Sequence, residues 1–127
     1  MKEHLTKNET DKLFNLTKIS PRSRVSVGID YGGMPIYEKR YSISELISML
    51  PLNIDINRYY AEHEKYDSPT NDAVLLGMVY DDRYNEWYTK YENVDYLFYE
   101  GSAPELIDSL FNAIFDLVNE WKVLEFN

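Results

Sequence analysis

The clearest pattern of apolar and polar residues lies near the C-terminal end of the chain. Apolar side chains recur at every third or fourth position from Leu106 to Trp121, and acidic or amide side chains occupy many of the positions between them. This period is typical of an amphipathic α-helix that buries one broad face. Ser102 and Glu105 have the spacing of a capping box, which predicts that the helix begins just after Ser102.

The middle of the chain has the patterns of β-strands. An apolar run at 73–80 lies between turn-forming residues and predicts a buried strand. Two aromatic segments at 86–91 and 94–99 predict the next strands, with Gly101 at the end of an antiparallel meander. Earlier in the chain, residues 25–29 alternate between apolar and small or polar side chains, and extended character resumes at Met34.

A hairpin is expected where these two earlier segments meet. The turn falls in Asp30-Tyr-Gly-Gly, because glycine adopts the positive φ that hairpin turns need. Ser42 and Glu45 then form a second capping-box pattern, which predicts a short helix near 43–50 that ends at Pro51. Ser42 and Ser102 both begin the order Ser-x-x-Glu-Leu-Ile-x-x-Leu, which either a duplicated hairpin-helix unit or convergence on an efficient helix start would explain.

Two further segments are less regular. Residues 8–16 have a capping residue followed by acidic and then apolar side chains, which suits a short helix. Residues 55–66 fit either helical spacing or an extended strand, and their tyrosines and turn-rich flanks favour the strand. We expect an N-terminal segment at 1–22 that extends from the domain and contains the short helix, followed by a single α+β domain at 23–127.

Together these elements predict an α+β fold. An antiparallel β-meander of about five strands is packed by the long C-terminal amphipathic helix, because a helix with so broad an apolar face must bury it against another layer. The short helix near 43–50 and the short N-terminal helix complete the fold.

Charge is distributed unevenly along the chain, whose net charge is −9. Residues 1–24 hold six basic and three acidic side chains, whereas the remainder holds seven basic and nineteen acidic ones. Such an acidic region repels nucleic acid and attracts basic partners. The alternative explanation is that the negative charge only keeps the protein soluble. The chain contains no cysteine, which excludes disulfides, thiolate zinc sites and cysteine nucleophiles. It has neither a run of about 18 apolar residues nor a signal-peptide pattern, so we expect a cytoplasmic protein.

One short motif suggests catalysis. The stretch Val27-Gly-Ile-Asp-Tyr-Gly-Gly33 resembles the first strand and turn of sugar-kinase and actin-like ATPases, and of small Holliday-junction-resolvase-like proteins of the ribonuclease H fold. The resemblance implies that Asp30 holds a divalent metal in a nuclease or phosphatase. Asp81, Asp82 and Glu100 are the carboxylates that could join it at the metal. The alternation of strands and helices that gathers such carboxylates is absent, so we expect a surface turn at Asp30 and no metal, cofactor or catalytic residue.

Tyrosine is the unusual residue type, with 12 in the chain and most of them in the predicted sheet. Tyrosine and tryptophan are enriched at protein interfaces, because they bury a large area and keep a polar group. Carboxylates lie beside these aromatic residues, which predicts an acidic, aromatic surface for a basic protein partner. The expected contact residues are Asp81, Asp82, Tyr84, Glu86, Trp87 and Tyr88.

The layout as a whole resembles small acidic α+β proteins of bacterial phages and mobile elements. That resemblance implies a regulator that occupies the basic surface of a nucleic-acid-binding protein, and no enzyme activity. The alternatives are the metal-dependent nuclease or phosphatase centred on Asp30, and a homo-oligomer, such as a homodimer, formed through the tyrosine-rich sheet.

Overall fold

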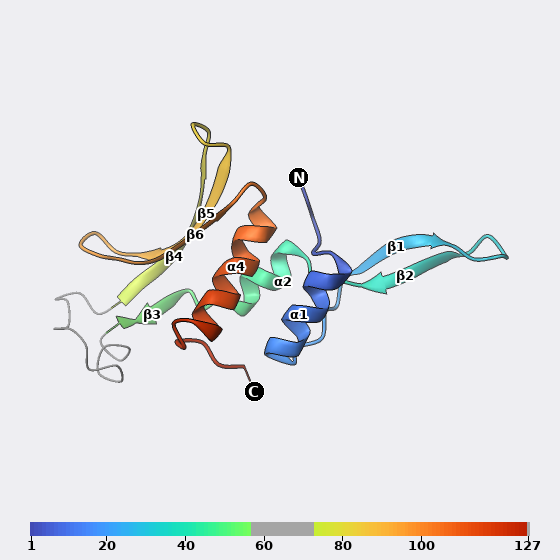
Figure 1. Cartoon of the computed structure of the whole chain (residues 1–127), viewed down its shortest axis with the longest axis horizontal. Helices are drawn as coiled ribbons and strands as arrows, with labels where there is room; N and C mark the ends of the chain where they lie inside the picture. The colour runs from blue at the N-terminus through green and yellow to red at the C-terminus, as the bar shows by residue number, and fades with distance from the viewer. Residues whose placement is uncertain (57–72, 127) are drawn as a thin grey trace.

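A computed structural model describes residues 1–56 and 73–126 of the chain. It confirms the α+β fold, with helices at α1 (Lys7–Thr17), α2 (Ile43–Met49) and α4 (Leu106–Asn119) (Figure 1). The strands are β1 (Arg24–Ile29), β2 (Pro35–Lys39), β3 (Asn53–Asp55), β4 (Ala73–Asp81), β5 (Glu86–Glu92) and β6 (Leu97–Ala103). Most of the ambiguous segment 55–66 lies outside the described residues.

Four strands form one curled antiparallel sheet in the order β3-β4-β5-β6. Tyr91 of β5 pairs with Leu76 of β4 and with Tyr99 of β6, so these three side chains share one face of the sheet. Helix α4 packs on that face, where Tyr91 and Tyr99 are buried. Alternation along the strands sends the intervening residues to the outer face.

Two hydrogen bonds fix α4 to the sheet. The Thr89 hydroxyl on β5 lies 2.8 Å from that of Ser109, and both residues are buried. The Tyr99 hydroxyl on β6 donates to Oδ2 of Asp116 at 2.6 Å. Burial raises the pKa of Tyr99 far above its ordinary value, with a further contribution from the bond to Asp116. Tyrosines near the helix are therefore part of the core.

The predicted capping box at Ser102 and Glu105 is wrong. Strand β6 continues through Gly101 to Ala103, and Ser102 pairs with Tyr88 in the ladder between β5 and β6. Glu105 is the N-cap of α4 and makes no side-chain capping bond. The backbone of this segment pairs with β5, and a pattern of neighbouring residues does not predict pairing with a strand elsewhere in the chain. The Ser42 and Ser102 patterns therefore are not two equivalent helix starts.

The capping box of α2 is confirmed. The Ser42 side chain accepts from the backbone amide of Glu45, and the Glu45 side chain accepts from that of Ser42. Helix α1 has the same device at Thr6 and Glu9, so it begins slightly before the expected capping residue Asn8. Both helices are short, and such caps satisfy amides that have no partner within the helix.

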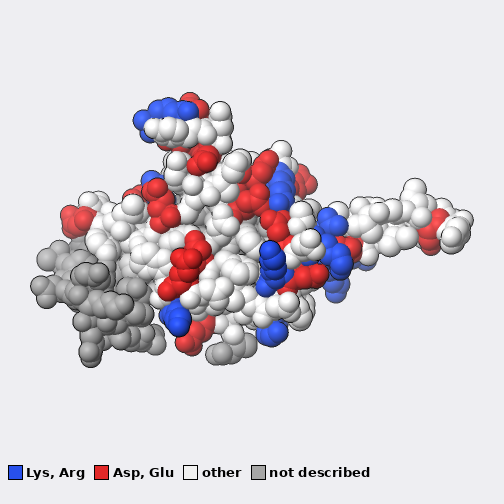
Figure 2. All heavy atoms as spheres, viewed as in Figure 1, with Lys and Arg blue, Asp and Glu red and all other residues white. Residues whose placement is uncertain are grey.

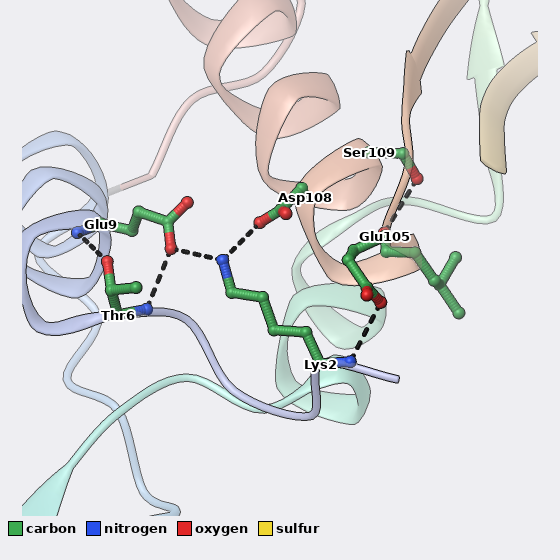
Figure 3. Close-up of polar contacts among 7 residues, drawn as sticks. Lys2, Thr6, Glu9, Glu105, Asp108 and Ser109 are labelled. Carbon is green, nitrogen blue, oxygen red and sulfur yellow. Dashed lines mark hydrogen bonds and ion pairs between the residues drawn. The ribbon is translucent and has the colours of Figure 1, made fainter. Parts of the chain in front are cut away.

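The N-terminal segment packs into the same core as the sheet and helices. Leu5 and Leu13 are fully buried. The backbone amide of Lys2 donates to Glu105, and its ammonium group lies 2.8 Å from carboxylate oxygens of both Glu9 and Asp108 (Figure 3). Residues of α1 and α4 are thus joined through one lysine. The boundary expected at residue 22 stays a prediction.

Strands β1 and β2 form a separate two-stranded sheet. This hairpin, which we call the arm (residues 24–39), projects from the body beside α1 and away from the four-stranded sheet (Figure 1). Its turn follows the prediction: Gly33 has φ 81°, and Oδ1 of Asp30 accepts from the amides of Gly32 and Met34 at 2.9 Å each.

Candidate protein-binding surfaces

The predicted contact residues lie together at the end of the hairpin between β4 and β5, which we call the tip (residues 80–88). The tip extends beyond the start of α4, at the top of the view in Figure 1. Tyr84 is 65% exposed, and Tyr80 and Asp82 are also exposed. Hairpin pairing brings these side chains together, because Asp81 lies opposite Glu86 and Tyr80 opposite Trp87.

One of the three tip carboxylates is already neutralised. Arg83 holds Asp81 through Nη2 at 2.9 Å and Nε at 3.1 Å, and its backbone amide donates to the same carboxylate at 3.0 Å. Hydrogen bonds from the Arg83 side chain and backbone lower the pKa of Asp81. Asp82 and Glu86 make no ion pair with any residue in the described ranges. The acidic character of the tip therefore comes from Asp82 and Glu86.

Two of the predicted residues point to opposite faces of the hairpin. Trp87 packs on Tyr80, with ring centroids 5.3 Å apart, on the face that carries Thr89 and α4. Tyr88 is on the outer face, opposite Val79 and Ser102. Burial, followed by the nearby Glu86 carboxylate, raises the pKa of the Tyr88 hydroxyl. The tip is thus a two-sided projection with aromatic side chains on each face.

The turn gives the tip a fixed shape. Asn85 has φ 51°, a conformation that asparagine tolerates better than most residues. Its side-chain oxygen accepts from the Tyr80 hydroxyl at 3.1 Å. The Arg83 guanidinium lies 5.5 Å from the centre of the Tyr84 ring. These contacts orient the exposed aromatic rings of the tip.

Asp30, the candidate metal ligand, lies in the turn at the far end of the arm. One of its carboxylate oxygens, Oδ1, accepts the two turn amides described above. Asp81, Asp82 and Glu100 belong to the four-stranded sheet and its tip, on the other side of the helices. Among the described residues, no group of three or more acidic or histidine side chains is placed to hold a metal ion.

The arm is a surface that sequence reasoning missed. Ile29 is 70% and Met34 is 64% exposed, and Val27, Tyr31, Ile36 and Tyr37 are exposed as well. Figure 2 shows that uncharged residues cover most of the outer arm, with basic and acidic side chains gathered where it joins the body. The sequence indicates the hairpin, but its pattern does not say whether another element packs against the two strands.

The root of the arm is held by one carboxylate on α2. Glu45 accepts from the amides of Arg22 at 2.7 Å and Ser23 at 3.1 Å. Burial opposes ionisation of Glu45, but hydrogen bonds from the Ser23 side chain and from three amides outweigh it and lower the pKa. Tyr41, which is fully buried, donates its hydroxyl proton to the carbonyl of Ile19. The arm therefore leaves the body in a defined direction.

Comparison with protein-family models, with curated proteins and with solved structures found no match. In the described part of the chain, no helix has the length and apolar character that crossing a membrane requires.

Proposed function

We propose that this chain is a non-catalytic protein-binding module whose tip contacts a basic surface of a partner protein. The observation that carries the proposal is the arrangement of the tip. Tyr84 and the ring pair of Tyr80 and Trp87 lie on the same hairpin as the carboxylates of Asp82 and Glu86. Aromatic anchors with adjacent charges are the composition of many protein interfaces.

Electrostatics supports a basic partner. Residues 73–103 hold six acidic and two basic side chains. Arg83 is paired with Asp81, and the ammonium group of Lys90 lies 3.9 Å from Glu92. A field of one sign steers an oppositely charged partner toward the surface and weakens as salt rises. A nucleic-acid-binding protein has such a basic surface, so that class of partner fits the proposal.

Charge reversal at the tip tests the proposal. The variant Asp82→Lys/Glu86→Lys leaves the Asp81–Arg83 pair in place, so the turn is preserved. The control Glu3→Lys/Glu125→Lys changes the net charge equally at exposed sites away from the tip. Each protein is used to capture partners from a cell lysate at low and high salt, with identification by mass spectrometry.

We expect the wild type and the control to retain a basic protein at low salt and to release it at high salt. The tip variant should lose it. Retention of the same protein by the tip variant, or capture that does not depend on salt, would show that the tip is not the contact surface.

A further inference from the structure

The arm ends in an exposed apolar ribbon with charged side chains at its root. Its apolar residues are on both faces of two strands, so folding of the single chain covers neither face. At the root, Arg22, Arg24 and Lys39 are exposed, and Arg24 lies 5.2 Å from the centre of the Tyr37 ring. An exposed ribbon with these properties is typical of an interaction site.

The outer face of the four-stranded sheet has complementary properties. Strand pairing places Leu75, Glu92 and Leu97 in one row across β4, β5 and β6. The next row holds Gly77, Lys90 and Glu100, and a Cβ atom added at Gly77 would meet nothing within 4 Å. Leu75 is 59% and Val79 is 47% exposed. Leu75, Val79 and Leu97 are exposed on this face, and the space above Gly77 is open. Glu92 and Glu100 outnumber Lys90, whose ammonium group lies 3.9 Å from Glu92.

Charge and hydrophobicity therefore match between the two surfaces. The apolar arm fits the exposed Leu75, Val79 and Leu97 side chains. The basic root fits the excess negative charge that Glu92 and Glu100 leave beside Lys90. In one chain the surfaces cannot meet, because α2 and α4 lie between them and the arm points away from the sheet (Figure 1). Two copies can satisfy both surfaces.

We propose that the arm of one copy docks on the outer face of the four-stranded sheet of a second copy. The two contact surfaces differ, so the interface is head-to-tail, and each added copy presents a further arm or sheet. This self-association uses residues outside the tip and so goes beyond the proposed partner binding.

Size-exclusion chromatography with light scattering on two variants tests the inference. The arm variant is Ile29→Asp/Met34→Asp, and the sheet variant is Leu75→Asp/Val79→Asp. All four residues are exposed, so the core stays intact. Phe14→Asp, on the exposed side of α1, is the control. Circular dichroism and thermal melting establish whether each variant is folded. If a double variant does not fold, the single change Met34→Asp replaces the arm variant and Leu75→Asp replaces the sheet variant.

The wild type and the control should exceed the monomer mass of 15.1 kDa, increasingly so at higher concentration and less so at high salt. Each variant alone should remain a monomer, because its copies lack one of the two surfaces. An equimolar mixture of the variants should give a species of twice the monomer mass, since one wild-type arm and one wild-type sheet face remain.

Three results would overturn the inference. The first is a wild type that is monomeric at every concentration. The second is a sheet variant that still associates, which would indicate pairing of one arm with another. The third is a mixture of the two variants that stays monomeric.

Discussion

Ser23 donates a hydrogen bond from Oγ to Oε1 of Glu45 over 2.6 Å, and this contact joins the root of the arm to α2. The same carboxylate closes the capping box of that helix through the Ser42 amide at 3.2 Å. One side chain therefore both starts a helix and fixes the direction of a hairpin about twenty residues earlier in the chain.

Replacement of Glu45 should destabilise the fold. The change Glu45→Ala removes the acceptor for the amides of Arg22, Ser23 and Ser42. Hydrogen bonds to charged groups contribute roughly 1.5 to 3 kcal/mol each. We expect the free energy of unfolding to fall by about 2 kcal/mol in total, because water replaces part of what is lost. Urea unfolding measures it, with exposed Glu3→Ala as the control. Equal effects of the two changes would show that Glu45 does not anchor the arm.

Stability should decrease on acidification. The pKa values of Glu9 and Glu45 are below the ordinary 4.5. Burial alone would raise both values, but hydrogen bonds outweigh it. The main donor is the Lys2 side chain for Glu9 and the Ser23 side chain for Glu45. A lowered folded-state pKa gives stability that is complete above the unfolded value of 4.5 and is lost as pH falls through the folded values. Urea unfolding at a series of pH values from neutral downward measures this loss. The change Glu45→Gln should flatten the curve, and an unchanged pH dependence in that variant would contradict the assignment.

Two strand glycines should respond oppositely to alanine. A Cβ at Gly101 would clash with the Tyr99 hydroxyl, which cannot easily move because it is bound to Asp116. We expect Gly101→Ala to cost about 1 to 3 kcal/mol. Gly77→Ala has open space around the new methyl group and should be neutral or slightly stabilising.

Tyr99→Phe provides the internal check on this pair. It removes the atom that clashes most closely, so Gly101→Ala should cost less in that background, and a double-mutant cycle from thermal melting gives the coupling. Simple additivity of the two changes would show that the clash with the hydroxyl is not the cause.

Divalent metal should leave the Asp30 turn unchanged. Oδ1 of Asp30 accepts two turn amides, and Asp81, Asp82 and Glu100 lie on the far side of the helices, so they cannot join Asp30 in holding a metal ion. We expect the backbone amide signals of Asp30 and Gly32 to stay in place when Mg²⁺ or Mn²⁺ is added, with Asp30→Ala as the reference for nonspecific effects. A saturable shift that Asp30→Ala abolishes would revive the nuclease or phosphatase hypothesis.

The sequence predicted those elements that depend on local patterns. The apolar period from Leu106 predicted α4, and Ser42 with Glu45 predicted the start of α2, because both signals act within a few residues. Ser102 carries the same local signal but pairs with Tyr88, and this long-range pairing decides its conformation. The sequence also did not predict which tyrosines are buried, since strand register decides that Tyr91 faces α4 and Tyr88 faces away.

The candidate surfaces show the same division. Proximity of the tip residues followed from the predicted turn between two strands. The neutralisation of Asp81 did not, because it depends on the side-chain geometry of Arg83. Exposure of the arm depended on the absence of a covering strand, and a hairpin pattern does not say whether another element packs against it.

The most direct test of partner binding is to map the contact surface by nuclear magnetic resonance. The partner identified by capture is added to isotope-labelled protein at low salt, and backbone amide and tryptophan indole signals are followed. Our account predicts that the largest shifts fall at Asp82, Tyr84, Glu86 and Trp87 and that they vanish in Asp82→Lys/Glu86→Lys. Shifts confined to other parts of the chain, with the tip unchanged, would contradict it.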